Sequence, residues 1–242
     1  KWAGRLTSAG WTVVIVDQIK DMRGKVKERK VSRILSPSTH IENTTSTDTP
    51  YVVTLYFQAN NLTAPSFGAG ALDLTTGSTH TYAGVANGRH DIWTADDLVQ
   101  MLSVFQPKEL IIYWKGEARE TQTPNVDLFR RIFGIPQTVT IHIRPVETTG
   151  AFSKELVRTE YLQKTYSIKS VLPAKTYLGL RSESEEMALL FLLQFVEEHY
   201  ASLIQSLQRN EPWIPHTHLV CGNHPLSQLQ MSSENGILSL FT

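Results

Sequence analysis

Four side chains of the kinds that bind zinc lie within nine residues of one another: His216, His218, Cys221 and His224. Imidazole nitrogens and thiolates are ligands that Zn²⁺ prefers. Closed structural zinc sites, however, normally draw their ligands from two separated pairs, and this segment is short and flanked by prolines. The alternative interpretation is a polar connection with a buried cysteine. The spacing favours this alternative, so we predict no metal site in the chain.

The acidic residues do not have the arrangement that a nuclease requires. Two-metal cleavage of a phosphodiester needs several carboxylates that converge on two ions. The β-rich run 51–57 carries no acid, and Asp73 is the only acid in the hairpin that follows. We expect Asp73 to brace the turn at residues 75–77. The remaining candidates begin a predicted helix: Asp91, Asp96 and Asp97.

Neither phosphate-binding glycine pattern is present in a suitable setting. Gly68 and Gly70 lack the third glycine of a dinucleotide fingerprint and lie in a predicted hairpin, where a dinucleotide site would need a strand-to-helix turn. No G-x-x-x-x-G-K-[ST] motif occurs in the chain. We therefore predict no catalytic and no cofactor-binding residues here.

Basic residues are concentrated in one segment, residues 20–33. It holds seven Lys and Arg residues against two acids in fourteen positions. Phosphate contacts need such a patch and little sequence specificity. A solvated hairpin is the other common role of a charge run. No Arg or aromatic residue in the segment has a base-reading context.

Composition limits the class of protein. Across 242 residues the hydrophobic content is 41% and Lys plus Arg equals Asp plus Glu, at 23 each. A core can therefore form, but most of the chain is not expected to lie on a phosphate backbone. One cysteine excludes an internal disulfide and fits a reducing, intracellular compartment. The longest apolar run, 187–193, is far shorter than the ~20 residues that span a bilayer. We therefore interpret it as a buried helix face and expect no membrane association.

The first 145 residues alternate between strand and helix patterns. Residues 1–9 favour a helix that ends at Gly10. Strands are predicted at 12–16, 26–35, 51–57, 67–74, 78–82, 109–114 and 138–143. Helices are predicted from an N-cap at Thr94 to Pro107 and over 126–133, closed by Gly134. This order predicts an α/β fold with a mixed sheet.

Strand signals stop after Pro145. Residues 152–165 are helical in composition, and 182–207 is the clearest helix of the chain. Ser182 and Glu185 have the spacing of a capping box, and an apolar stripe follows at helical spacing.

Residues 5–39 resemble the end of the mismatch-recognition domain of the MutS family. In that family a helix ends at a Gly, a strand runs to a Glu-Gln or Asp-Gln pair, and an Arg-x-Val-x-x-Ile strand ends in Thr-Pro-Gly-Thr. The corresponding segments here are Asp17-Gln18 and 29–34. The final turn departs from the pattern, because 36–39 reads Ser-Pro-Ser-Thr and Ser38 replaces the glycine.

The next segments resemble the MutS connector domain, a non-catalytic fold similar to RNase H. Residues 67–77 resemble its aromatic-Gly-x-Ala-x-x-Asp hairpin, and 106–111 resemble its Pro-x-Glu-Leu-Leu step from helix to strand. Residues 186–207, 218–231 and 233–241 resemble more weakly the entry into its helical core and lever.

The resemblance implies three parts: the C-terminal part of a mismatch-binding domain (1–47), a connector domain (48–146) and the start of a helical core or lever (147–242). It implies that the full protein binds mismatched duplex DNA as a homo- or heterodimer, couples this to ATP with Mg²⁺ as a DNA-dependent ATPase, and meets a MutL-like partner. The family's mismatch-reading Phe-x-Glu would precede residue 1, so we expect the chain to be a fragment. Within it, Lys25 and Lys27 are the predicted DNA-backbone contacts.

A second hypothesis is a free-standing protein-interaction module with an RNase H-like fold and no role on DNA. The reading frame around the chain distinguishes the two, because the first hypothesis requires further coding sequence on both sides.

Overall fold

A computed structural model describes residues 2–20, 25–39, 51–58, 66–84, 92–115, 125–146 and 150–217. It is a mixed α/β structure, as predicted, with a six-stranded sheet and a separate two-stranded one. The large sheet has the order β7-β6-β3-β4-β5-β8, and its edge strand β8 (Glu211–Pro212) pairs in parallel with β5.

The centre of the large sheet is a meander followed by parallel strands. Strands β3 (Tyr51–Gln58), β4 (Ser66–Asp73) and β5 (Thr79–Gly84) pair antiparallel in sequence order. Strands β6 (Glu109–Lys115) and β7 (Thr140–Pro145) then add in parallel on the other side of β3. Both are reached through a helix, as parallel connections require. These directions make the sheet mixed, as the predicted order of strands and helices implied.

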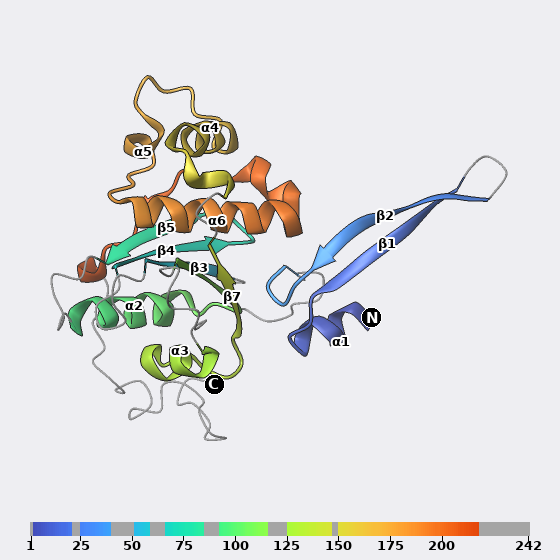
Figure 1. Ribbon diagram of the computed structural model, residues 1–242, viewed down its shortest axis with the longest axis horizontal. Helices are drawn as coiled ribbons and strands as arrows, with labels where there is room; N and C mark the ends of the chain where they lie inside the picture. The colour runs from blue at the N-terminus through green and yellow to red at the C-terminus, as the bar shows by residue number, and fades with distance from the viewer. Residues whose placement is uncertain are drawn as a thin grey trace.

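Helices cover both faces of the sheet (Figure 1). On one face, α2 (Ile92–Phe105) and α3 (Val126–Phe133) pack on alternate side chains of β3 and β6, around Phe57 and Ile112. On the other, α6 (Glu183–Tyr200) lies across β3 and β4, with α4 (Glu155–Thr165) and the short α5 (Ala174–Tyr177) outside it. Each face therefore has its own apolar core, and the sheet is buried on both sides.

The N-terminal residues form a hairpin that extends away from the sheet (Figure 1). Helix α1 (Trp2–Ser8) ends at Gly10, whose φ of +86° is the left-handed geometry that favours glycine. Strands β1 (Val13–Lys20) and β2 (Val26–Leu35) then pair antiparallel. We call these two strands, together with Lys25 immediately before β2, the basic arm.

The predicted turn between β4 and β5 is confirmed. The Asp73 carboxylate accepts hydrogen bonds from the Thr75 N–H at 2.8 Å, the Thr75 hydroxyl at 2.6 Å and the Thr76 hydroxyl at 2.7 Å. Gly77 closes the turn with a φ of +73°. Burial of Asp73 opposes its ionisation, but these hydrogen bonds outweigh it and hold the pKa of the carboxyl below its usual range.

Two helix boundaries differ from those predicted. Helix α2 begins at Ile92, so Thr94 lies in its first turn and is not the N-cap. The helix predicted over 182–207 ends at Tyr200, where the backbone leaves helical geometry (φ −146°, ψ 61°) and a 3₁₀ segment, Ala201–Ser206, follows. Apolar periodicity continues across that break, which is why the sequence pattern does not reveal it.

The predicted capping box at the start of α6 is half formed. The Ser182 hydroxyl accepts a hydrogen bond from the Glu185 N–H at 3.1 Å. The Glu185 carboxylate does not reach back to Ser182; it accepts from the Arg181 N–H at 2.7 Å and from the Thr81 hydroxyl at 2.7 Å. The local bond of Glu185 is therefore displaced by one residue, and Thr81 on β5 adds a tertiary partner.

Helix α6 lies very close to β4 because two glycines leave room for it. A Cβ atom at Gly68 would stand 1.9 Å from the Ser184 carbonyl oxygen, and one at Gly70 would stand 3.2 Å from Thr54 Oγ1. The Thr54 hydroxyl donates to the Ala188 carbonyl of α6 at 2.7 Å. The Gly-x-Gly pair thus serves helix packing.

The segment Glu183–Ser206 is, among the described residues, the one helical stretch with the length and apolar character of a membrane span, but half of its most apolar window is buried inside the protein. A core helix has the same properties, and α6 contributes ten buried residues to the structure. This agrees with the prediction that its apolar run is a buried helix face.

Candidate functional site

The predicted DNA-backbone residues lie on the basic arm, at the start of β2. Lys25 and Lys27 are both exposed. Further along β2 the exposed cations are Arg29, Lys30 and Arg33. The arm therefore presents several cations to solvent, although nothing in the structure tests contact with a phosphate, and Lys25 and Lys27 stay a prediction.

Strand register decides which of these cations face an acid. Lys30 lies directly opposite Asp17, an arrangement in which opposite charges attract. Arg29 lies opposite Gln18. Lys27 falls at a register shift, where Ile19 faces Glu28 and Lys20 faces Val26. Lys27 therefore has no cross-strand residue directly opposite it. A bulge of this kind can change the direction of a side chain.

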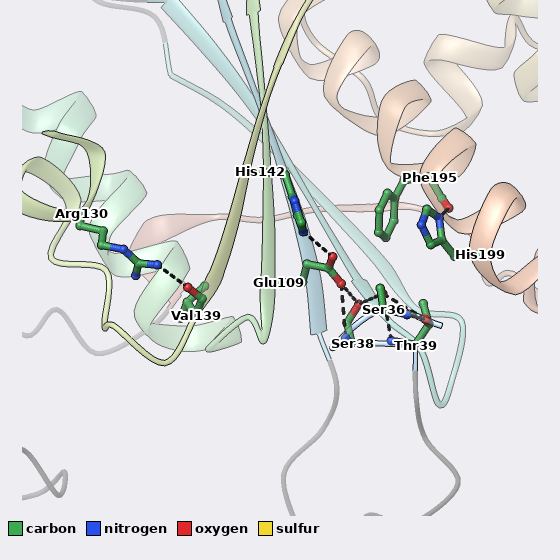
Figure 2. Close-up of polar contacts among 9 residues, drawn as sticks. All are labelled: Ser36, Ser38, Thr39, Glu109, Arg130, Val139, His142, Phe195 and His199. Carbon is green, nitrogen blue, oxygen red and sulfur yellow. Dashed lines mark hydrogen bonds and ion pairs between the residues drawn. The ribbon is translucent and has the colours of Figure 1, made fainter. Parts of the chain in front are cut away.

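At its base the arm ends in a buried polar turn that contacts the large sheet (Figure 2). Ser36, Ser38 and Thr39 are 0%, 1% and 5% exposed. Within the turn, the Ser36 N–H donates to Thr39 Oγ1 at 2.7 Å. The Ser36 hydroxyl lies 3.0 Å from Thr39 Oγ1 and 3.2 Å from Ser38 Oγ.

Glu109, the first residue of β6, receives this turn. Its Oε2 accepts from the Ser38 hydroxyl at 2.6 Å and from the Ser38 N–H at 3.3 Å. Its Oε1 lies 2.8 Å from His142 Nε2 on β7. An ionised carboxylate only accepts hydrogen bonds, so this ring nitrogen carries the proton. We call Ser36, Ser38, Thr39, Glu109 and His142 the junction.

The electrostatics of the junction favour the charged carboxylate. Glu109 is fully buried, and burial alone would raise its pKa. Hydrogen bonds from His142 and Ser38 outweigh that burial and hold the pKa of Glu109 below its usual range. The buried charge is therefore compensated by directional, charge-assisted bonds, which are the stronger kind.

Sequence reasoning missed the junction. The segment 106–111 was identified only as a step from helix to strand, and 36–39 only as a departure from a family turn. One local signal was available: a Glu within an otherwise apolar strand that is buried on both faces requires a partner. The identity of the partner was not accessible, since Ser38 and Glu109 are 71 residues apart.

A cavity of about 290 Å³ lies on the α6 face, bordered by Tyr56 and Tyr113 of the sheet and by Phe191 of α6. The buried guanidinium of Arg158 also lines it. This group donates to the Phe152 carbonyl at 3.1 Å and lies 3.3 Å from Glu186 and 3.5 Å from Glu183. The cation is thus committed to holding α4 against α6.

The geometry gives no support to a nuclease. Asp73 is occupied by its turn, and Asp97 accepts a hydrogen bond from the Tyr82 hydroxyl at 2.6 Å. Asp91 lies outside the described residues. Within the part of the chain that the structure describes, no group of three or more His, Cys, Asp or Glu side chains could hold a metal ion.

The zinc-type segment stays untested. Residues 218–224 lie outside the described residues, and so does the side chain of His216.

Comparison with known proteins finds relatives among the DNA mismatch-repair proteins. No protein-family model matches the chain. A curated mutS homolog of DNA mismatch repair from Acanthamoeba polyphaga mimivirus is 24% identical over 253 residues, covering 96% of this chain and 22% of the relative. A mitochondrial DNA mismatch repair protein, a mutS homolog from Sarcophyton glaucum, is 24% identical over 265 residues, covering 96% of this chain and 25% of the relative.

Both relatives are named as DNA mismatch-repair proteins, and both align along almost the whole chain. These similarities support the resemblance to the MutS family that the motifs indicated. It spans about a quarter of the length of these relatives, which is consistent with the predicted fragment. The matches support a MutS-like repair role and do not favour the free-standing interaction module.

Proposed function

We propose that this chain links the DNA-contacting part of a MutS-type mismatch-repair protein to the rest of the molecule. In this proposal the basic arm contacts the DNA backbone through Lys25 and Lys27, and the RNase H-like sheet holds the arm at a fixed position. The observation that carries the proposal is the junction, in which a turn at the base of the arm is hydrogen-bonded to a buried carboxylate of the sheet.

The arm has the properties of one edge of a larger DNA-reading domain. Five of its aliphatic side chains are between 43% and 52% exposed: Val14, Val16, Ile19, Val26 and Val31. A two-stranded hairpin is marginally stable by itself, and exposed apolar side chains favour further packing. This supports the proposal that residues 1–47 form the end of a mismatch-binding domain.

The sheet is proposed to be the connector. The predicted range for it is 48–146, with 147–242 as the start of the helical core or lever. Because α6 closes one face of the sheet and shares its apolar core, we propose that the connector also takes in α4, α5 and α6. The lever would then begin beyond Tyr200.

The activities of the whole protein are proposed on the same basis. We propose that it binds mismatched duplex DNA as a MutS-type homo- or heterodimer. We also propose that this dimer meets a MutL-like partner and works inside the cell. ATP and Mg²⁺ would bind outside these 242 residues, which contain no Walker A motif. The chain's own contribution would be mechanical, without a catalytic residue.

Duplex binding by the arm is the first prediction. The chain should bind a fluorescent duplex weakly and without preference for a mismatch, and the affinity should fall as salt rises, because counterion release drives phosphate contacts. Replacing both Lys25 and Lys27 with Ala should weaken binding about tenfold at low salt and reduce the salt slope by about 2. Fluorescence anisotropy titrations between low and moderate salt measure both quantities.

Lys164→Ala with Lys169→Ala is the matched control. It removes two exposed lysines from the other end of the molecule and leaves the arm intact. Equal losses in the two double variants would contradict contact through the arm. Mismatch-selective nanomolar binding by the chain would contradict the proposal that the mismatch-reading element lies elsewhere.

A further inference from the structure

The junction is a buried polar contact between the basic arm, which is mostly exposed, and the large sheet, which is mostly buried. Along the arm, residues 25–33 are all exposed. At its base, Ser36 and Ser38 are buried, and Glu109 is fully buried beneath them. Strand β2 also contacts α6, but the hydrogen bonds from the base of the arm to the sheet converge on one carboxylate.

We propose that Glu109 is the positioning residue of the basic arm: it sets the direction in which the arm leaves the sheet. The expected effect of Glu109 on duplex binding rests on the proposed function. Its expected effect on the orientation of the arm rests on geometry alone. Charge-assisted hydrogen bonds depend on direction as well as distance, so they define an orientation that apolar contact alone would leave loose. Removing the carboxylate would also leave the buried donors of Ser38, and the half-buried ring N–H of His142, without their acceptor.

Ser38 supplies the donors of the contact that Glu109 accepts. It replaces the glycine of the family turn, and it does so without backbone strain, since its φ is not positive. Its hydroxyl gives Glu109 the shortest hydrogen bond of the junction, at 2.6 Å, whereas a glycine would offer only the N–H at 3.3 Å. The departure from the family pattern therefore tightens the attachment of the arm.

The test measures the direction of the arm without DNA. Spin labels are placed at exposed positions, Gln18→Cys on the arm and Glu160→Cys on α4, in a Cys221→Ser background of the 242-residue chain. Pulsed dipolar spectroscopy should give one narrow distance distribution for this protein. Glu109→Ala should broaden it strongly, and Ser38→Gly should broaden it by a smaller amount.

Two further variants separate positioning from stability. Glu109→Gln should keep a narrow distribution, because its amide oxygen can still accept from both Ser38 donors, which form the contact between arm and sheet. Ser182→Ala removes the N-cap of α6 and lowers the melting temperature, yet should leave the distribution unchanged. An unchanged distribution in Glu109→Ala, with native circular dichroism, would overturn the inference; so would equal broadening in Ser182→Ala.

Duplex binding then separates this inference from the proposed function. Glu109→Ala should weaken binding about threefold to tenfold, with the salt slope unchanged because the same lysines remain. If Glu109→Ala does not fold, the Ser38→Gly variant gives the same comparison with a smaller expected change. Broadening by Glu109→Ala in a chain that binds no duplex would overturn the proposed function and leave the positioning role intact.

Discussion

Gly68 lies where the first turn of α6 meets β4, and its missing side chain decides how closely the helix approaches the sheet. A Cβ atom there would stand 1.9 Å from the Ser184 carbonyl oxygen and 2.2 Å from its carbonyl carbon. Because both obstacles are backbone atoms, the helix itself would have to move.

We expect Gly68→Ala to lower the free energy of unfolding by about 3 kcal/mol, the cost of overpacking a core. Gly134→Ala is the control. Gly134 has a φ of +61° with no atom within 4 Å of an added Cβ, so only backbone strain of about 1 to 2 kcal/mol is expected. Urea unfolding of both variants measures the difference, and a smaller loss at Gly68 than at Gly134 would contradict the close approach of α6.

Glu109 links the junction to pH. Its pKa is lower in the folded protein than its ordinary value of about 4.3, so its ionised form stabilises the fold. That stabilisation is fully present above the ordinary pKa and is lost as pH falls through the lower, folded one.

We therefore expect the wild type to lose its stability advantage over Glu109→Gln as pH falls from above the ordinary pKa of a glutamate through the lower pKa of folded Glu109. Both proteins retain Asp73, whose pKa is also lowered, so the comparison isolates Glu109. Urea unfolding across this range measures the difference. An advantage that grows as pH falls would contradict the assigned direction of the shift.

At the scale of elements, the arm and the sheet differ in how much of their backbone is protected. Strand β3 is flanked by β4 and β6 and covered by helices, and its residues 52–57 are buried. Strands β1 and β2 pair only with each other among the described residues, and most of their side chains are exposed. Local opening should therefore be much easier in the arm.

We expect amides of β1 and β2 to exchange with deuterium at least about tenfold faster than those of β3, because a two-stranded hairpin is only marginally stable. Mass spectrometry of peptic peptides measures the rates. Adding a short duplex should slow exchange in the arm and leave β3 unchanged if the proposed contact is correct. Equal protection of arm and sheet would contradict the difference in stability.

The neutral chain as a whole carries its positive charge unevenly. Lys plus Arg and Asp plus Glu are equal, at 23 each, yet seven of the cations fall within residues 20–33. The fold places the described part of that segment on a hairpin that extends from the sheet (Figure 1). The net charge of the chain is zero, but its cations are concentrated on an arm that is positioned to contact a phosphate backbone.

Several features of this protein were determined by the sequence alone, because they depend on neighbours only a few residues apart. The Asp73 turn, the end of α3 at Gly134 and the buried positions of α2 are of this kind, since hydrogen-bonding geometry and side-chain periodicity act locally. The order of the predicted strands and helices extended this to the mixed sheet.

The tertiary structure alone decided what those elements do together. It gave Glu185 an additional partner on β5. It also placed α6 against Gly68 and brought Ser38 to Glu109 across 71 residues. Each of these contacts depends on the relative placement of distant segments, and a linear pattern contains no information on which buried donor will meet which buried acceptor. The sequence therefore indicated the family and the basic arm, whereas the connection between arm and sheet became visible only in the fold.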